Sequence, residues 1–273
     1  NSDDYRAYVG GTSGLIYGYV NDGFYTVADF ESFDSKSRTW KLKEGVVDSS
    51  PLSDTPRPGN AKFKKLTPVD PNSTNPYQLT EADRTVIGNT TPKFSGGFGL
   101  NATYKGFDMS MFFNFMYDFD VLNANKIMLT TWADNKENNF LMDIASDKRW
   151  RNFDDMGNEI RYSPEVLAEF NKNATMWNPT SIGRPICMSY AVEDGSFLRL
   201  NSATLGYTLP SVWTKKVGLS KVRFYVSGNN LFTLTGYSGY DPEVNIATGL
   251  TPNIDYNRYP RSRTYTFGAQ LTF

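Results

Sequence analysis

The chain has 273 residues, enough for one large or two small domains, and its single cysteine, Cys187, excludes an internal disulfide. It contains no histidine, which excludes Ser-His-Asp and Cys-His catalysis and His-bearing zinc sites and leaves only a carboxylate-based enzyme. The net charge of −1 argues against nucleic acid as a partner, because there is no basic excess to neutralise phosphates.

The hydrophobic content is low, at 39%, but aromatic residues reach 15%, with 19 Phe and 17 Tyr. Composition alone does not settle the fold, but a membrane β-barrel can combine a polar interior and polar loops with an aromatic outer band, whereas a soluble protein of this polarity would not normally need so many aromatics. The sequence has no run of about 18 apolar residues, so no transmembrane helix is expected. Residues 1–5 lack the basic start and apolar stretch of a signal peptide, which predicts a mature chain or a piece of a longer one.

In chain order, the first predicted strand covers residues 15–20 and is closed by the turn-forming Asn21-Asp22-Gly23. From there to residue 92 the chain is polar, rich in proline and irregular, apart from two short strand candidates at 24–33 and 38–47. Loops beyond about 15 residues are uncommon in compact domains and are usually functional or disordered.

The clearest predicted hairpin follows, over residues 93–104 and 107–118 with a tight turn at Lys105-Gly106. Apolar residues alternate with polar ones and glycines along both strands, as expected when successive side chains point to opposite faces. Each strand has the length of about ten residues that a tilted strand needs to cross a bilayer. Glycines on the polar face predict close packing against that face, or a bend.

A second polar stretch covers residues 119–196, where Ser163-Pro164-Glu165 predicts the start of a short helix over 164–172. Further strands are predicted over 197–208, 222–231 and 263–273. The last strand has one apolar face, formed by Tyr265, Phe267, Ala269, Leu271 and Phe273. Such a strand fits either a half-buried sheet or a barrel wall between lipid and an aqueous lumen.

The connections between the predicted strands are either short or very long. The turns at 105–106 and 210–220 are short, whereas those at 21–92, 119–196 and 232–262 are long. In strands that alternate in direction, all short turns then fall at one end, as in outer-membrane barrels with short periplasmic turns and long extracellular loops. Six strands cannot close such a barrel, because open edges in hydrocarbon leave backbone groups unpaired. The pattern predicts an all-β fold, with residues 1–273 as the C-terminal part of a transmembrane antiparallel β-barrel.

Several motifs, in the same order along almost the whole chain, resemble the SusC/RagA family of TonB-dependent outer-membrane transporters. They are Tyr17-Gly18-Tyr19 with Asp22-Gly23, the Asp-Arg-Thr motif at 83–89, residues 104–108, 193–200 and 204–210, residues 227–235, Gly239-Tyr240-Asp241-Pro242-Glu243, and Tyr259-Pro260-Arg261 with the last strand. The resemblance implies a barrel of about 22 strands in the bacterial outer membrane. It also implies that roughly the last six to eight strands lie in this chain, and that the plug domain, the earlier strands and the TonB-contacting segment lie upstream of it.

The resemblance implies a function as well: import of oligosaccharides or peptides across the outer membrane, energised through TonB. A SusD-like lipoprotein is expected as a lid on the extracellular face. The implied partners are this lipoprotein, TonB, the rest of the same barrel, outer-membrane lipid, and a glycan or peptide substrate. No cofactor is expected.

Five loop aromatics are candidates for substrate contact, because aromatic rings stack on sugar faces beside hydrogen-bonding Asn and Asp. They are Trp132, Trp150, Trp177, Tyr237 and Tyr240. The alternative, which we favour, is that these rings pack the loops onto one another or onto the lid. Asp241-Pro242-Glu243 is interpreted as a turn that shapes the last loop. In the resembling proteins a C-terminal aromatic residue is read by the outer-membrane assembly machinery, which assigns Phe273 the role of an assembly signal.

No metal site is predicted. A calcium site would need several oxygen ligands at close spacing on a Gly-assisted turn. Before the Asp-Arg-Thr motif only Asp70, Asn72 and one of Glu81 or Asp83 are available.

No enzyme is predicted either, because a glycosidase needs two converging acids. The acids at hand, Asp154, Asp155 and Glu159, lie in a polar loop, where such groups are usually solvated. The remaining alternative is a soluble β-sandwich carbohydrate-binding module, which would have shorter strands and evenly spaced loops.

Overall fold

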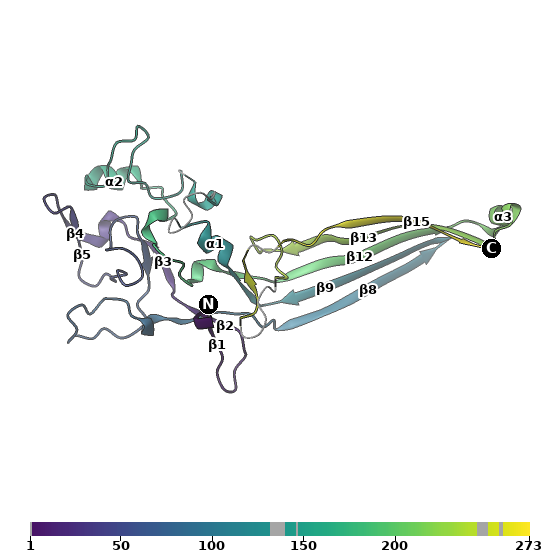
Figure 1. Cartoon of the computed structure of the whole chain (residues 1–273), viewed down its shortest axis with the longest axis horizontal. Coiled ribbons are helices and arrows are strands. Elements are labelled where there is room, and N and C mark those ends of the chain that lie inside the picture. Colours follow the sequence, from purple (N-terminus) through teal and green to yellow (C-terminus); the bar gives the residue numbers. More distant parts are fainter. Residues whose placement is uncertain (1, 132–139, 146, 245–250, 257–258) are drawn as a thin grey trace.

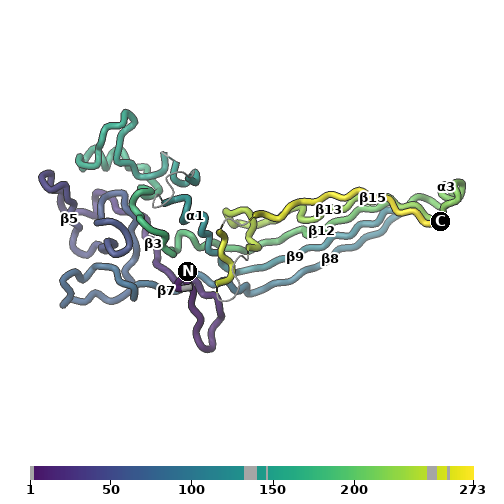
Figure 2. The backbone as a smooth tube through the Cα atoms, viewed as in Figure 1, coloured from purple at the N-terminus to yellow at the C-terminus, as the bar shows by residue number. Residues whose placement is uncertain are grey.

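The computed structural model describes residues 2–131, 140–145, 147–244, 251–256 and 259–273. They form two parts: a long five-stranded sheet, and an assembly of loops, short strands and short helices at one end of it (Figures 1 and 2). No helix of the described chain is long and apolar enough to cross a membrane.

The long sheet has the strand order β15-β13-β12-β9-β8, with every neighbouring pair antiparallel. Its strands are β8 (Phe94–Tyr104), β9 (Phe107–Tyr117), β12 (Phe197–Thr208), β13 (Lys221–Thr235) and β15 (Thr264–Thr272). Within the described chain, β8 and β15 pair with no further strand and form two open edges. Open edges are not tolerated in hydrocarbon, so inside a membrane this sheet would need a neighbouring strand on each side.

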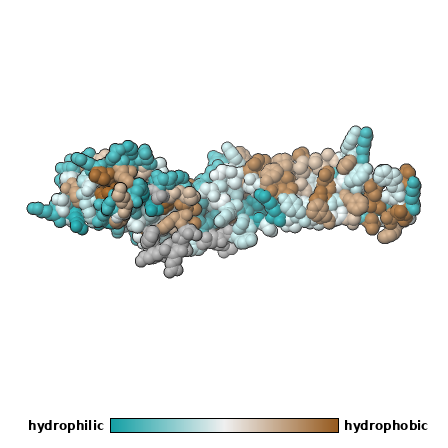
Figure 3. Space-filling view, turned by 90° about the horizontal axis from the view of Figure 1, so that it is seen from above, coloured by the Kyte–Doolittle hydropathy of each residue, from teal (hydrophilic) through white to brown (hydrophobic). Residues whose placement is uncertain are grey.

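One face of the long sheet is apolar across all five strands, because the register sets apolar residues beside one another. Leu100 lies opposite Met111, Met111 opposite Ala203, Ala203 opposite Gly228, and Gly228 opposite Tyr265. In the described part of the chain most of this face is uncovered: Phe267 is 80% exposed, and hydrophobic residues are spread along the sheet in Figure 3. A membrane barrel presents such a face to lipid, whereas a soluble sandwich covers it with a second sheet.

A β-bulge at Asn201 keeps this face apolar along β12. The register of β12 shifts between Leu200 and Ser202 relative to both of its neighbours. One extra residue reverses the alternation, so Leu200 before the bulge and Leu205 after it lie on the same face. Without the bulge, half of the apolar side chains of β12 would turn to the polar face.

The short connections lie at the end of the sheet opposite the loop assembly (Figure 1). Lys105-Gly106 joins β8 to β9 with both residues in the left-handed region, at φ 46° and 88°, which matches the twist of a tight hairpin. Between β12 and β13 the chain forms only α3 (Ser211–Thr214) and the 3₁₀ turn Lys215–Val217. The end-to-end asymmetry predicted from loop lengths is confirmed.

The loop assembly contains its own small sheets. They are β1 (Tyr5–Arg6), β2 (Leu15–Gly18) and β7 (Thr85–Asn89); β10 (Asp120–Asn123), β11 (Val192–Asp194) and β14 (Ile254–Asp255); β3 (Asn21–Phe24) with β6 (Ala61–Phe63); and β4 (Phe30–Asp34) with β5 (Thr39–Leu42). Its α-helices are α1 (Ala124–Met128) and α2 (Pro164–Phe170). Its 3₁₀ turns are Ser2–Asp4, Val27–Asp29, Glu81–Asp83, Met142–Ile144, Pro179–Ser181 and Ser189–Ala191.

Two sequence predictions need correction here. The strand predicted at 15–20 is β2, which pairs with β1 and β7 in the loop assembly, so this chain supplies five strands to the long sheet rather than six. Ile16 is fully buried there, and a side chain at Gly18 would meet the Cys187 carbonyl oxygen at 2.4 Å. Residues 21–23 begin β3 instead of closing a turn, with Gly23 at φ 77° inside a pairing irregularity. A short apolar alternation fits either kind of sheet, so periodicity could not separate them.

Most of the buried apolar side chains lie in the loop assembly, while Phe197, Leu200 and Val222 are buried in the long sheet. The largest cluster includes Phe63, Leu79, Trp177, Ile182 and Met188. A second packs Leu167 of α2 against Trp150 and Ile160, and α2 itself begins at Pro164 as predicted. Burying each large apolar side chain contributes roughly 1.5–3 kcal/mol, which accounts for defined structure in connections of this length.

Candidate functional site

The polar face of the long sheet carries an ion pair that crosses three strands. Arg223 on β13 reaches over β12 to Asp108 on β9, where its Nε donates to Oδ1 at 2.9 Å. The strand between them offers Gly206, and a Cβ at that position would lie 2.4 Å from the Arg223 Nη2. Gly206 therefore opens the path that allows the guanidinium to reach the carboxylate.

Aromatic side chains cover other glycines of the same face. Tyr225 lies over Gly268 of β15, where a Cβ would come within 2.4 Å of the ring, and Phe112 lies over Gly97, within 2.8 Å. For Gly97, which belongs to the predicted hairpin, the prediction of close packing is confirmed, and at both glycines the partner is a side chain of the adjacent strand. The result is a wall lined by charged, hydroxyl and aromatic groups.

Where this wall meets the loops, Arg199 of β12 holds the last loop. Its side chain is 2% exposed, and its Nη1 donates to Asp241 Oδ2 at 3.3 Å while its Nη2 contacts Asp241 Oδ1. Glu243 lies 3.6 Å from Arg199 and 3.0 Å from Arg261. Burial disfavours the charged carboxyl, but hydrogen bonds from Arg199 and the Glu243 backbone outweigh it and lower the pKa of Asp241. Asp241-Pro242-Glu243 thus shapes the last loop, as predicted, by pairing with the barrel wall.

A second polar junction joins the last loop to β10 and β11. Glu193 accepts hydrogen bonds from the Ser238 backbone N–H at 3.0 Å and from Asn123 Nδ2 at 3.1 Å, and it lies 3.3 Å from Lys126 Nζ. Burial alone would raise the pKa of Glu193, but these partners lower it. Nearby, the buried Tyr237 hydroxyl donates to Asp255 Oδ2 at 2.7 Å. Burial raises the pKa of Tyr237, so the phenol keeps the proton that it donates.

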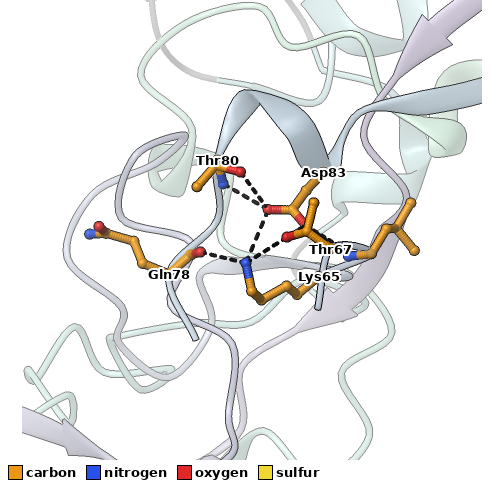
Figure 4. Close-up of polar contacts among 6 residues, drawn as sticks. Lys65, Thr67, Gln78, Thr80 and Asp83 are labelled. Atoms are coloured by element: carbon orange, nitrogen blue, oxygen red, sulfur yellow. Dashed lines mark hydrogen bonds and ion pairs between the residues drawn. The ribbon is translucent and has the colours of Figure 1, made fainter. Parts of the chain in front are cut away.

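The Asp-Arg-Thr motif organises the first long loop. Asp83 is fully buried and accepts hydrogen bonds from the Leu66 and Thr67 backbone N–H groups at 2.9 and 2.8 Å and from the Thr80 N–H at 2.8 Å, and it lies beside Lys65 (Figure 4). Burial would raise the pKa of this carboxyl, but the hydrogen bonds lower it strongly.

Arg84, the next residue of the motif, joins the first loop to the N-terminal segment. Its Nη2 donates to the Tyr17 carbonyl at 2.8 Å and to Asp4 Oδ1 at 3.0 Å, and its guanidinium lies 5.0 Å from the centre of the Tyr17 ring. The motif is therefore structural in this chain.

The five predicted substrate-contacting aromatics do not form one group. Trp150 and Trp177 are 3% and 2% exposed, and their rings pack edge-on against Phe24 and Tyr190. Tyr237 is also buried, whereas Tyr240 is 83% exposed. Trp132 lies outside the described residues. Trp150, Trp177 and Tyr237 therefore pack the loops onto one another. Among the four of these aromatics that the structure describes, only Tyr240 is open to a ligand.

Phe273 follows β15 and is 90% exposed. Its carbonyl oxygen accepts a hydrogen bond from Ser220 Oγ at 3.3 Å, so the last residue is joined to the short-turn end of the sheet. Its role as an assembly signal remains a prediction.

The carboxylates considered for catalysis are engaged in local contacts. Asp154 accepts from the Met156 and Asn158 backbone N–H groups at 2.9 and 2.8 Å, Asp155 pairs with Arg151 at 2.7 Å, and Glu159 pairs with Arg161. In this arrangement each carboxylate stabilises the loop to which it belongs.

The oxygens considered for a metal site also accept hydrogen bonds from nearby groups. Asp70 accepts from the Asn72 backbone N–H in its own turn, and Asp83 accepts from the backbone N–H groups of the first long loop. Within the described ranges no three His, Cys, Asp or Glu side chains are grouped to hold a metal ion.

Sequence reasoning missed the two junctions of the last loop and the Arg223–Asp108 pair. Arg199 and Asp241 are 42 positions apart, and Arg223 and Asp108 are 115 apart. For the Arg223–Asp108 pair the sequence held one signal: a glycine on the polar face of the strand that lies between the two charged residues. A glycine there leaves room for a long side chain to cross that strand.

No protein-family profile matches the chain. Over 266 residues it is 33% identical to TonB-dependent receptor P3 of Formosa agariphila, an alignment that covers 95% of this chain and 22% of that protein. An 88-residue stretch, 31% of this chain, is 38% identical to TonB-dependent receptor SusC of Bacteroides thetaiotaomicron and covers 8% of it.

Solved structures agree on the fold. A structure of the RagAB peptide transporter matches with a TM-score of 0.58 and 22% identity, over 96% of this chain and 23% of that one. The RagAB peptide importer in its "open-open" state matches with a TM-score of 0.54 and 23% identity, over 94% of this chain and 22% of that one. The chain thus spans less than a quarter of the length of these relatives. With its open-edged sheet and apolar outer face, it corresponds to part of the β-barrel of a SusC/RagA-type TonB-dependent outer-membrane receptor.

Proposed function

We propose that the protein to which this chain belongs imports oligosaccharides or peptides across the outer membrane, with energy delivered through TonB. The chain covers 22% of receptor P3, and we assign the plug domain, the earlier strands and the TonB-contacting segment to the remainder. A SusD-like lipoprotein is the proposed extracellular partner. The similarity to SusC and to the RagAB structures supports this partnership.

The observation that carries this proposal is a polar barrel wall with loops fixed at its rim. Arg199 belongs to a strand of the wall and pairs with Asp241 of the last loop, so the loop has a defined position at the entrance. A wall of charged, hydroxyl and aromatic groups offers the contacts that a passing polar oligomer needs.

The soluble β-sandwich binding module is the alternative function. It requires a second sheet over the apolar face of the first. In the described part of the chain no element covers that face, on which Phe224, Phe267 and Leu271 are exposed. The observation therefore favours the transporter.

Tyr240 is the loop aromatic that we propose for direct substrate contact. Its ring is exposed in the same loop segment that Arg199 anchors through Asp241. Trp150, Trp177 and Tyr237 are proposed to act by holding the loops around it.

Uptake in the source bacterium tests the proposal. Cells with the receptor gene deleted are compared with complemented cells for uptake of fluorescent oligosaccharide and peptide pools, each with and without TonB. We expect uptake of one pool to require both the receptor and TonB, and the Tyr240→Ala receptor to reach normal membrane levels with weaker uptake. Equal uptake in deleted and complemented cells would refute the function, and unchanged uptake by Tyr240→Ala would refute the role of Tyr240.

A further inference from the structure

At the far end of the loop assembly, a cavity is lined by a concentration of arginines. One lobe of about 500 Å³ is bounded by residues 149–154, Arg161 and 178–180, and a smaller lobe is bounded by Arg38, Trp40 and Arg57. The lobes adjoin, because Asn152, Arg161 and Thr180 line both. In Figure 1 this region is the end that carries β4, β5 and α2. We call it the arginine cavity.

Positive charge in the arginine cavity exceeds the negative charge around it. Five arginines line the lobes, namely Arg38, Arg57, Arg149, Arg151 and Arg161, against Asp54 and Asp154. Arg151 and Arg161 have carboxylate partners in Asp155 and Glu159. Within the described ranges no carboxylate pairs with Arg38, Arg57 or Arg149. Arg38 and Arg57 are exposed, so their guanidinium groups are open to an anionic ligand, although the chain as a whole has a net charge of −1.

Two of the arginines lie near the same aromatic ring. The Arg38 guanidinium lies 4.8 Å and that of Arg161 5.6 Å from the centre of the Tyr162 ring, which stacks on Phe33. A planar guanidinium fixed on an aromatic ring loses little further freedom when it binds a carboxylate or sulfate through two parallel hydrogen bonds. The site is thus prearranged for an anionic group.

The remaining lining suits a sugar. The Asn152 side chain makes no hydrogen bond within the described residues and faces both lobes, while Trp40 and Phe153 line the walls. Phe153 is 46% exposed. Aromatic surface for sugar faces, an amide for hydroxyls and arginines for acid groups together match an acidic glycan.

We infer that the arginine cavity binds a glycan that carries carboxylate or sulfate groups. The inference rests on the proposed import function and specifies its substrate class. Arg38 and Arg57 contact the acid groups, Asn152 contacts hydroxyls, and Phe153 stacks on a sugar ring. The glycan is captured here, at the tip of the loops, before it reaches the barrel wall.

Binding to the purified full-length receptor, measured by calorimetry at low salt, tests the inference. The probes are oligogalacturonate, a sulfated carrageenan oligosaccharide, a neutral maltooligosaccharide of equal length, and an oligoglutamate peptide. We expect at least one acidic glycan to bind, with an affinity at least tenfold above that of the neutral glycan and the peptide. Binding should weaken as salt rises, since ionic contacts at exposed arginines are screened.

Variants localise the site. Arg38→Gln and Arg57→Gln should each weaken acidic-glycan binding about tenfold, as expected when one charge-assisted hydrogen-bonding group is lost. Lys36 belongs to the same hairpin as Arg38 but does not line the cavity, so Lys36→Gln removes one charge and should leave binding unchanged. Equal melting curves verify that all three variants are folded. The inference is overturned if neither acidic glycan binds, if the neutral glycan or the peptide binds as well, or if Lys36→Gln weakens binding as much as Arg38→Gln. A receptor that still imports nutrient in a TonB-dependent manner then retains the proposed function and loses only this substrate class.

Discussion

At the scale of single residues, the loops depend on a few buried charges. Arg199, Asp83 and Asp241 are each surrounded by several partners, and each joins segments that are distant in the sequence. A buried charge that loses its partner is strongly destabilising, whereas an exposed ion pair contributes little. Substitutions at these residues should therefore release the loops from their positions.

The first prediction concerns Arg199. Arg199→Gln removes the cation from a side chain that is 2% exposed and leaves Asp241 without its main partner. We expect the last loop to lose about 3 kcal/mol of local stability, so that its amides exchange hydrogen roughly 100 times faster by mass spectrometry. Arg151→Gln breaks a pair whose aspartate is 78% exposed and is the matched control, with a change below about 1 kcal/mol. Equal effects of the two substitutions would contradict the anchoring role of Arg199.

The second prediction concerns Phe273. Its side chain is 90% exposed and contributes little to the packing of this chain. If it is read during assembly, Phe273→Ser lowers the amount of inserted barrel several-fold while uptake per inserted molecule stays the same. Quantitative blotting of outer-membrane fractions, combined with an uptake assay, separates the two quantities. Unchanged membrane levels would count against the role of Phe273 as an assembly signal.

At the scale of elements, the alternation of residues predicted the barrel strands well. The hairpin at 93–104 and 107–118 appears as Phe94–Tyr104 and Phe107–Tyr117, because a strict period of two over this length has few other solutions. The bulge at Asn201 was not predictable in this way. It depends on the registers of both neighbouring strands, which a single strand's pattern does not contain.

The third prediction tests the glycine and aromatic pairing within the sheet. Gly268→Ala places a Cβ within 2.4 Å of the Tyr225 ring, which must move, at a cost of about 1–3 kcal/mol. The folded barrel should convert to the unfolded band at a lower temperature on a semi-native gel, and Tyr225→Ala in the same chain should restore part of the loss. Gly236→Ala, whose Cβ meets no atom within 4 Å, is the control. If the control shifts the transition as far as Gly268→Ala does, close packing is not the reason for glycine at 268.

At the scale of the whole molecule, sequence predicted the two-part layout but not the interior of the loop assembly. Loop lengths and strand direction alone placed all the long connections at one end. The contacts inside the assembly join distant segments, as where Tyr19 bridges to Met188, and a single sequence has no local signal for them. For the same reason the burial of Trp150 and Trp177 and the arginine cavity became evident only in three dimensions.

The fourth prediction concerns the stability of the loop assembly against pH. The pKa values of Asp83, Glu193 and Asp241 are lowered by folding from ordinary values of 3.8 for Asp and 4.5 for Glu. Their stabilisation is therefore fully present at neutral pH and is lost as the pH falls below those ordinary values. Asp120, whose pKa is raised by burial, has the opposite sign and offsets part of the loss. After correction for the intrinsic effect of pH, the protection of the loop amides against hydrogen exchange should be constant from pH 8 to 6. Below about pH 4 this protection should fall, so that the amides exchange faster. A loss of protection between pH 7 and 6 would contradict this assignment.

The central claim is that the apolar face of the long sheet meets lipid and the opposite face meets the lumen. Phe267 and Thr266 are adjacent residues of β15 that lie on opposite faces. In a full-length receptor that carries Cys187→Ser, each of the two is replaced in turn by a single cysteine and labelled with a fluorophore. The labelled receptor is then placed in vesicles that contain brominated lipid. We predict strong quenching at position 267 and weak quenching at 266, because bromine on lipid chains reaches only the outer face. Equal quenching at the two positions, or stronger quenching at 266, would contradict the claim that this sheet is a wall of a membrane barrel.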